Sequence, residues 1–343
     1  MKKNKTSGQK IMMSVMCTLL AIVLLLLIVV AVFMETFLGR IDKVDPSQDT
    51  LSSEDLQELL RPEATRGEDY TGPAYNHDEI VKPSAPAQVI ESENTVNILL
   101  IGQDRRGSTG RSLSDAMILC TINKKTKTLT MTSFLRDIYI SLPGHSWQKL
   151  NVAYPAGGME LLDKTLEVNF GVKIDGNVEV DFAQFSKIID LVGGVDINLT
   201  AAEAAHLNKE YGFWLKEGVN HLNGEEALQY SRIRRIGTDF GRTNRQRIVL
   251  TALVDQFRNA NLAQLTNTLT GVLELITTDM TDAEIVGYVV ELAPLLKDLK
   301  IESQSIPAEG TYSFGDVADR GIMDCIFIDF EANRKLLAET LAE

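Results

Sequence analysis

One long apolar run near the amino terminus stands apart from the rest of the chain, where hydrophobic and polar positions alternate at strand and helix spacings. Ile11 to Phe33 is 23 residues without a charge, enough to cross a bilayer with a little tilt. Four lysines precede it within residues 1–10, while Glu35 and Asp42 follow it. The positive-inside bias therefore predicts a cytoplasmic tail, a transmembrane helix over 11–33 and a single-pass protein of the cell membrane. A cleaved secretory signal is the alternative, although such signals are usually shorter and end at small residues.

Residues 34–93 are rich in Asp, Glu, Ser, Thr and Pro and poor in large apolar side chains. A segment of this composition buries too little apolar surface to fold compactly, and five prolines between positions 46 and 86 act against a fold as well. We predict that it is an extracytoplasmic linker. Residues 94–343 are enough for one sizeable core and are predicted to form a single outer domain.

Within that domain, short β-branched apolar runs predict strands, and apolar spacings of three and four residues predict helices. Strands are predicted at residues 95–101, 116–122, 128–133, 138–142, 195–199 and 322–328, with a polar hairpin turn at 123–127. Helices are predicted at residues 158–170, 181–192, 201–209, 223–230, 241–258, 262–276, 281–292 and 331–341. Strands interleaved with helices indicate an α/β fold, a three-layer α/β/α sandwich around a mixed central sheet.

Charge changes the picture at one place in the chain. The formal net charge is −13, yet six of the sixteen residues from Arg232 to Arg247 are arginines. Such clusters hold anions, because the planar guanidinium group meets phosphate oxygens two at a time and stays charged when partly dehydrated. A solvated or salt-bridged basic helix end is the alternative.

Residue spacing predicts how the arginine cluster is arranged. If the chain is extended beyond the short helix at 223–230, Arg232 and Arg234 project to the same side. Arg242, Arg245 and Gln246 then share a face of the following helix, because they are three and four residues apart. The amino end of that helix adds free backbone donors to the same place.

Carboxylates are expected beside these arginines. Asp104 follows the first predicted strand, Asp115 opens the second, and Arg136 follows the third. Strand ends on one edge of a sheet are where α/β proteins place ligands. Asp104 and Asp115 are therefore candidate ligands for magnesium, or for manganese in its place, since such an ion bridges carboxylates to substrate phosphates. Simple neutralisation of the arginines is the alternative. The pattern predicts an extracytoplasmic site for a phosphorylated or pyrophosphorylated substrate.

Composition disfavours two other classes of site. The basic cluster is compact and the domain is acidic overall, which argues against nucleic-acid binding. The spacing of cysteines and histidines matches no zinc site. Cys120 and Cys325 both fall on the outer side, where they form either a disulfide or two free thiols.

Four blocks of sequence together resemble the LytR-CpsA-Psr family of membrane-anchored cell-wall enzymes of Gram-positive bacteria. They are NILLIGQDR at 97–105 with SDAM at 114–117, MTSFLRDI at 131–138, VDFAQFSKIIDLVGGVDINLT at 180–200, and GVNHLNGEEALQYSRIRR at 218–235 continued by DFGRTNRQR at 239–247. Each block alone is a weak signal. The joint pattern is specific, because the blocks stand in the family's order behind its usual single anchor.

The resemblance implies an α/β/α sandwich with a hydrophobic pocket for a polyprenyl chain. It also implies magnesium-assisted transfer of a phosphate-linked glycopolymer, such as teichoic acid or capsule polysaccharide, from undecaprenyl pyrophosphate to a peptidoglycan acceptor. By position, Asp104 and Asp115 correspond to the carboxylates near magnesium and, with Arg136 and Asp239, to the catalytic residues. The pyrophosphate contacts implied by position are Arg136, Arg232, Arg234, Arg242 and Gln246, with Asp239 orienting them.

Two parts of the implied site allow more than one interpretation. The family often has arginine where Leu113 stands here, and Arg111 is a candidate to replace that phosphate contact. The apolar face of helix 181–192 supplies candidate lipid-pocket residues or ordinary core packing, namely Phe182, Phe185, Ile188, Ile189 and Val192.

The residues leave the choice of function partly open. A polyprenyl pyrophosphate phosphatase would use the same site with water as the acceptor. A non-catalytic receptor for polyprenyl phosphates, or a regulator of transcription, is the other alternative. Two carboxylates disfavour a simple receptor, since they weaken anion binding unless a metal ion is present.

Overall fold

The structure is a computed structural model of the 343-residue chain. It describes residues 38–44, 73–81, 86–103, 111–234, 236, 239–259 and 271–341, and the chain divides into two units, 1–41 and 42–343. The described part of the first unit contains one 3₁₀ turn, η1 (Leu38–Arg40). No helix within the described ranges is long and apolar enough to cross a membrane. The predicted transmembrane run 11–33, Asp104 and most of the predicted helix 262–276 lie outside those ranges.

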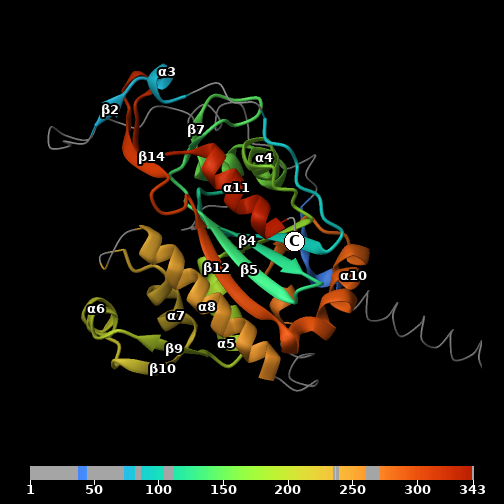
Figure 1. The fold of residues 1–343 in the computed structure, drawn as a ribbon. Coiled ribbons are helices and arrows are strands. Elements are labelled where there is room, and N and C mark those ends of the chain that lie inside the picture. The colour runs from blue at the N-terminus through green and yellow to red at the C-terminus, as the bar shows by residue number, and fades with distance from the viewer. Residues whose placement is uncertain are drawn as a thin grey trace, which may run out of the picture. The chain divides into compact units, whose positions relative to one another are not determined.

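A seven-stranded mixed sheet forms the centre of the second unit (Figure 1). In spatial order its strands are β1 (Asp42–Lys43), β11 (Thr277–Thr278), β8 (Gly176–Asp181), β3 (Thr95–Gln103), β4 (Ser114–Asn123), β5 (Thr128–Phe134) and β12 (Lys300–Ile306). Strand β3 pairs antiparallel with β4 and parallel with β8, so the predicted mixed sheet is confirmed. The predicted hairpin between β4 and β5 is confirmed too, with Asn123 Oδ1 accepting hydrogen bonds from the N–H groups of Lys125 and Thr126.

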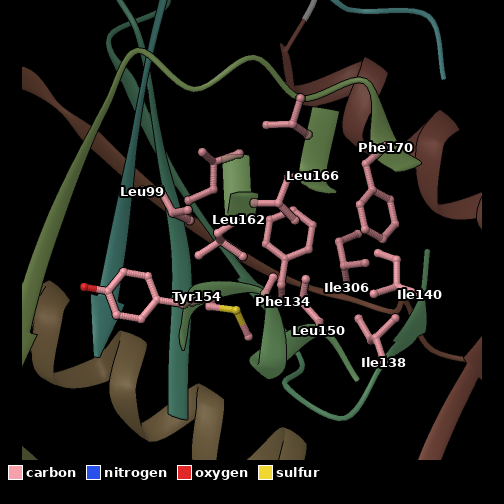
Figure 2. Close-up of a cluster of buried hydrophobic side chains, with 14 of the residues drawn as sticks. Leu99, Phe134, Ile138, Ile140, Leu150, Tyr154, Leu162, Leu166, Phe170 and Ile306 are labelled. Carbon is pink, nitrogen blue, oxygen red and sulfur yellow. The ribbon is translucent and has the colours of Figure 1, made fainter. Parts of the chain in front are cut away.

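One face of the sheet packs against two helices, α4 (Ala153–Phe170) and α11 (Phe330–Leu341). Because successive strand residues point to opposite faces, Leu99 and Ile101 of β3 both lie on this side and are fully buried. Figure 2 shows Phe134, the last residue of β5, among Leu162 and Leu166 of α4. This apolar cluster is the main core of the domain.

The opposite face of the sheet packs against α8 (Asp239–Asn259). Ile118 of β4 and Leu129 of β5 form a second cluster there with Leu250 and Val254 of α8. Helices therefore cover both faces of the mixed sheet. Both must be covered because β3 and β4 carry apolar side chains on each face.

Three shorter helices and a hairpin extend the α8 side: α5 (Phe182–Leu191), α6 (Ala201–Tyr211), α7 (Gly224–Ser231), and the pair β9 (Val195–Leu199) with β10 (Gly218–Leu222). A capping box starts α5, since Asp181 accepts from the Gln184 N–H while Gln184 accepts from the Asp181 N–H. Reciprocal boxes of the same kind also start α6 and α7. Capping satisfies backbone donors that the first turn of each helix leaves without partners.

A buried ion pair connects α6 to α8. Glu203 Oε1 lies 2.7 Å from Arg245 Nε, with side chains only 10% and 8% exposed. Burial acts to raise the pKa of Glu203, but hydrogen bonds from Thr200 and Arg245 outweigh it and hold that pKa below its ordinary value. Arg245 also donates to the carbonyl oxygens of Ile233 and Ile236, which fixes the segment that follows α7.

The remaining elements lie at the margins of the domain. A small sheet joins β14 (Ile322–Ile328), β13 (Tyr312–Val317) and β2 (Ala74–Tyr75), and β6 (Tyr139–Ile140) pairs with β7 (Gln148–Lys149). Further short pieces are α3 (His77–Ile80), η2 (Leu150–Val152), α10 (Asp282–Leu292), η3 (Ala293–Asp298) and η4 (Ala318–Arg320). Cys120 and Cys325 are not joined to each other, which settles the alternative in favour of no disulfide between them.

Gly224 allows the start of α7 to approach α5 closely. Its N–H donates a 2.7 Å hydrogen bond to Asp190 Oδ1. A Cβ atom at this position would lie 2.0 Å from the carbonyl oxygen of Ser186, a backbone atom that cannot rotate away. Only glycine fits here without separating the two helices.

Gly224→Ala is therefore expected to lower the free energy of unfolding by about 1 to 3 kcal/mol, as overpacking usually does. Gly287→Ala in α10 is the matched control, because an added Cβ meets nothing within 4 Å there. It is expected to stabilise the chain by about 0.5 to 1 kcal/mol, since alanine loses less conformational entropy in a helix. Denaturant unfolding of the two purified variants measures both effects, and equal stabilities would contradict the close packing of α7 on α5.

Candidate functional site

A cavity of about 530 Å³ lies between the sheet and α5, α6, α7 and α8. Most of its lining is apolar: Leu100, Ile118, Val178, Val180, Phe182, Phe185, Ile188, Leu228, Ile233, Leu250, Leu253, Phe257, Val272 and Ile276. The volume is within the range of small-molecule pockets, and each methylene group of a ligand buried here is stabilised by about 0.8 kcal/mol. Such a space suits a hydrocarbon ligand.

Three arginines of the site gather around a single carboxylate, that of Asp115 at the start of β4. Asp115 Oδ1 lies 2.5 Å from Arg136 Nη1, 3.6 Å from Arg234 Nη2 and 3.8 Å from Arg242 Nη1. The arginines come from the loop after β5, the segment after α7 and the first turn of α8. Because the three guanidinium groups share one oxygen, they have donor capacity left for a further anion.

Arg242 is the most enclosed of these arginines, with a side chain only 3% exposed. Its Nε atom lies 3.4 Å from Asp239 Oδ1, yet it is buried without a hydrogen-bond partner among the described residues. Burial lowers the pKa of Arg242, and the nearby charge of Arg136 lowers it further. A buried cation with an unused donor is a costly arrangement that an anionic ligand would relieve.

Asp137 holds Arg136 from the other side. Asp137 Oδ2 lies 3.2 Å from Arg136 Nε, and Lys149 Nζ lies 3.8 Å from Asp137 Oδ1. Burial acts to lower the pKa of Arg136, but Asp137 and Asp115 outweigh it and raise that pKa. Burial raises the pKa of Asp137 against the opposite pull of Arg136 and Lys149. Arg136 is thus oriented by two carboxylates before any ligand arrives.

Arg232 differs from its predicted conformation. The chain is not extended at this residue, which ends α7 with helical dihedral angles, φ −99° and ψ −3°. Its guanidinium carbon lies 4.6 Å from the ring centroid of Phe182, the distance of a cation–π contact. Arg232 and Arg234 nevertheless both line the cavity, as does Ile233 between them.

Gln246 follows Arg242 by one helical turn, and both side chains line the cavity as predicted. The Gln246 Oε1 atom is buried without a hydrogen-bond partner among the described residues. Arg245 does not share this face: it is bound to Glu203, so the prediction for that residue was wrong. Arg247 donates instead to Ser133 and Ser305 on the sheet, and burial lowers its pKa to about 10.

The remaining predicted site residues are Arg111, Asp239 and Asp104. Arg111 donates a 3.3 Å hydrogen bond to the carbonyl oxygen of Tyr154 and is not among the cavity-lining residues. Asp239 contacts Arg242 and keeps 35% of its side chain exposed. Asp104 lies outside the described residues and stays a prediction.

The predicted lipid-pocket residues on α5 divide into two groups. Phe182, Phe185 and Ile188 line the cavity. Ile189 is fully buried in the core between α5, β9 and α7, and Val192 ends the helix, so neither lines it. The prediction is corrected for these two because the apolar stripe of α5 is wider than the cavity, and one edge of it packs inward.

Sequence reasoning missed the opposite wall of the cavity. That wall comes from α8, where Leu250, Leu253 and Phe257 continue the face that carries Arg242 and Gln246. The spacing of three and four residues from Gln246 onward was a usable signal. Val178 and Val180 of β8 complete the floor, and they were missed because strand β8 itself was not predicted.

A magnesium ion is compatible with these residues. The described part of the chain brings no three side chains of His, Cys, Asp or Glu together as a metal cluster. Magnesium, however, usually takes only one or two protein carboxylates and completes its shell with water and substrate phosphates. Asp115 lines the cavity beside the arginines that would hold a phosphate, so it fits as one such carboxylate.

The chain is similar in sequence to known proteins. Residues 65–321 match the LytR_cpsA_psr family. Regulatory protein MsrR of Staphylococcus aureus (strain COL) is 30% identical over 274 residues, 79% of this chain and 81% of that protein. The polyisoprenyl-teichoic acid–peptidoglycan teichoic acid transferase TagT of Bacillus subtilis (strain 168) is 33% identical over 174 residues, 49% of this chain and 54% of that protein.

The fold is similar to solved structures as well. The crystal structure of B. subtilis TagT superposes with a TM-score of 0.60 at 26% identity, covering 76% of this chain and 97% of that chain. A structure of TagT with bound octaprenyl pyrophosphate gives a TM-score of 0.57 at 25% identity and the same coverage. Since the family match extends over most of the chain, from the last part of the predicted linker to η4, this protein belongs to the LytR_cpsA_psr family.

Proposed function

We propose that this chain transfers a phosphate-linked glycopolymer, such as a teichoic acid, from a polyprenyl pyrophosphate carrier to peptidoglycan during cell-wall assembly. One observation carries the proposal: Asp115, Arg234 and Arg242 line the same cavity as Phe182 and Phe185. A ligand with an anionic head and a long hydrocarbon tail satisfies both parts at once. The name of TagT as a teichoic acid transferase and its structure with octaprenyl pyrophosphate support this reading.

In the proposed reaction, a hydroxyl oxygen of peptidoglycan attacks the glycan-side phosphorus. A new P–O bond forms, the bond from that phosphorus to the bridging oxygen breaks, and polyprenyl phosphate leaves while the hydroxyl proton passes to the departing phosphate or to water. Negative charge grows on the phosphoryl and bridging oxygens. Arg136, Arg234 and Arg242 stabilise charge at this place, and Asp115 holds them there before the reaction, so little reorganisation is needed.

Magnesium belongs to the proposal as the metal ion of the site. Asp115 and Asp104 would hold it, and when bound it neutralises phosphate charge and stabilises the charge that develops on oxygen. Asp115 has a second task that does not depend on the ion, since its Oδ1 atom orients three arginines.

The proposed carrier is a membrane lipid, and we propose that residues 11–33 anchor the chain beside it. The lysines before the run and the acidic residues after it support a folded domain outside the membrane.

Incubation of the purified chain with a lipid-linked glycan and peptidoglycan oligomers is expected to yield glycan-bearing oligomers and polyprenyl phosphate. Asp115→Ala is expected to abolish the product, and thermal melting checks that the variant still folds, because the change also removes the shared counter-charge of three arginines. Removal of magnesium with a chelator is expected to slow the wild type strongly. Free glycan phosphate formed in water at the same rate with and without oligomers would instead assign a phosphatase.

Arg234→Ala is expected to reduce the transfer rate about tenfold to a hundredfold, since a hydrogen bond to a charged group is worth about 1.5 to 3 kcal/mol. Half of this side chain is exposed, so the fold should be unaffected. Arg234→Lys should recover only part of the loss, because lysine keeps the charge but not the two-pronged geometry. Lys187→Ala, on the exposed face of α5, is the control. Full activity of Arg234→Ala would place the phosphates elsewhere.

Protease added to intact protoplasts is expected to digest the region after residue 93, with a cytoplasmic protein of the same cells surviving as the control. Digestion of this region only after lysis would reverse the proposed topology.

A further inference from the structure

Three aromatic rings form a row beside the arginine cluster. The ring centroids of Phe240 and Tyr312 are 4.9 Å apart and the planes are tilted by 31°, while those of Tyr312 and Phe314 are 5.4 Å apart and nearly perpendicular. Phe240 and Tyr312 are half-buried against the main core, but Phe314 is 54% exposed. The row thus begins in the core and ends in solvent.

Both ends of the aromatic row are connected to residues that neighbour the arginines of the site. Phe240 follows Asp239 directly in the first turn of α8, two residues before Arg242. At the other flank, Phe314 is the cross-strand partner of Ile326, whose N–H donates a 2.8 Å hydrogen bond to the carbonyl oxygen of Asp137. Directly paired residues on neighbouring strands are about 5 Å apart. The row therefore starts two residues before Arg242, and its exposed end lies on the strand paired with the one that bonds to the Asp137 backbone.

Because side chains alternate along a strand, the aromatic row lies on the face of β13 that is opposite the core of the small sheet. Tyr312 and Phe314 are two residues apart on β13 and share one face, with Ile326 and Ile328 as their partners on β14. The other face carries Cys325 and Phe327, which are buried with Val317 and Tyr139. Ile326 and Ile328 pack into the main core from this face, and Phe314 lies at its solvent edge with 54% of its surface exposed.

We propose that Tyr312 and Phe314 form a stacking platform for a pyranose ring of the sugar next to the reacting phosphate. This proposal rests on the proposed transfer reaction and adds a subsite to it. The face of a pyranose ring that presents C–H groups packs on an aromatic ring, while its hydroxyl groups stay in water or bond to polar neighbours. The Tyr312 hydroxyl makes no hydrogen bond to another described residue, so it can meet a sugar hydroxyl.

A sugar fits the row better than two other occupants. A hydrocarbon chain has the apolar cavity, which lies on the α5, α6 and α8 side of the arginines. A stable protein partner needs about 800 Å² of contact on each side, and three rings, two of them half-buried, offer far less. The sugar can belong to the peptidoglycan acceptor or to the donor polymer, and the same stacking chemistry serves both.

Direct binding tests the platform without turnover. The probe is chitotetraose, the β-1,4-linked tetramer of N-acetylglucosamine, titrated into the purified chain and followed by ligand-observed NMR. Phe314→Ala is expected to raise the dissociation constant at least about fivefold, as loss of a ring contact of about 1 kcal/mol implies. Phe314→Trp should stay within about twofold of the wild type, because it keeps a ring. Val290→Ala, which truncates a 70% exposed side chain on α10, should not change binding.

Transfer kinetics identify which sugar the platform holds. A rise in the KM for peptidoglycan oligomers alone in Phe314→Ala assigns the acceptor, and a rise in the KM for the lipid-linked donor alone assigns the donor glycan. If Phe314→Ala changes neither KM and binds chitotetraose like the wild type, the platform does not exist. A wild type that binds chitotetraose through Phe314 but transfers nothing would contradict the proposed reaction while leaving the platform in place.

Discussion

The geometry of the site depends on one carboxylate, Asp115, lying among three guanidinium groups. Arg136 stands about a hundred residues before Arg234 and Arg242 in the chain, and the three like charges, gathered around one carboxylate, repel one another. Asp115 offsets that repulsion from a rigid position at the start of β4, next to the main core. Asp137 and Asp239 do the same at the edges, each holding one arginine. Without the Asp115 carboxylate, the three arginines would be free to separate. The same carboxylate therefore sets both the orientation of the arginines and the affinity that they can have for an anion.

The fold could be predicted where buried positions give the sequence a clear pattern of apolar residues. Strands β3 and β4 are packed on both faces and contain continuous apolar runs, β5 alternates polar and apolar residues, and α5 begins with the capping pair Asp181 and Gln184. Strands β8 and β12 escaped prediction for an opposite reason. The six residues of β8 contain only two apolar ones, and β12 is an edge strand in which Glu302, Ser303 and Gln304 occupy half-exposed or exposed positions. Their place in the sheet is decided by pairing with neighbours, which local composition does not encode.

The chemical identity of the site could be predicted better than its geometry. The density of arginines indicated an anion site, and the pairing of Arg242 with Gln246 followed from helical spacing. Arg245 has the same spacing but is drawn to Glu203, a residue more than forty positions earlier. Arg232 continues the helix for one residue and stacks on Phe182 rather than extending. In both cases a tertiary partner chose the orientation, and no pattern within the cluster names that partner.

The length of helix α8 fixes the distance between the charged end and the apolar end of the cavity. Its first turn carries Arg242 at the charged end of the cavity, and Phe257 lies fifteen residues further along the same wall, a helix rise of about 22 Å. The distance from Arg242 to the last apolar contact is therefore set by a single rigid element rather than by an adjustable loop. In the proposed function, a carrier whose hydrocarbon is shorter than this distance would leave the Phe257 end of the wall without contact and lose that part of its binding free energy. The length of one helix would then discriminate between short and long carriers.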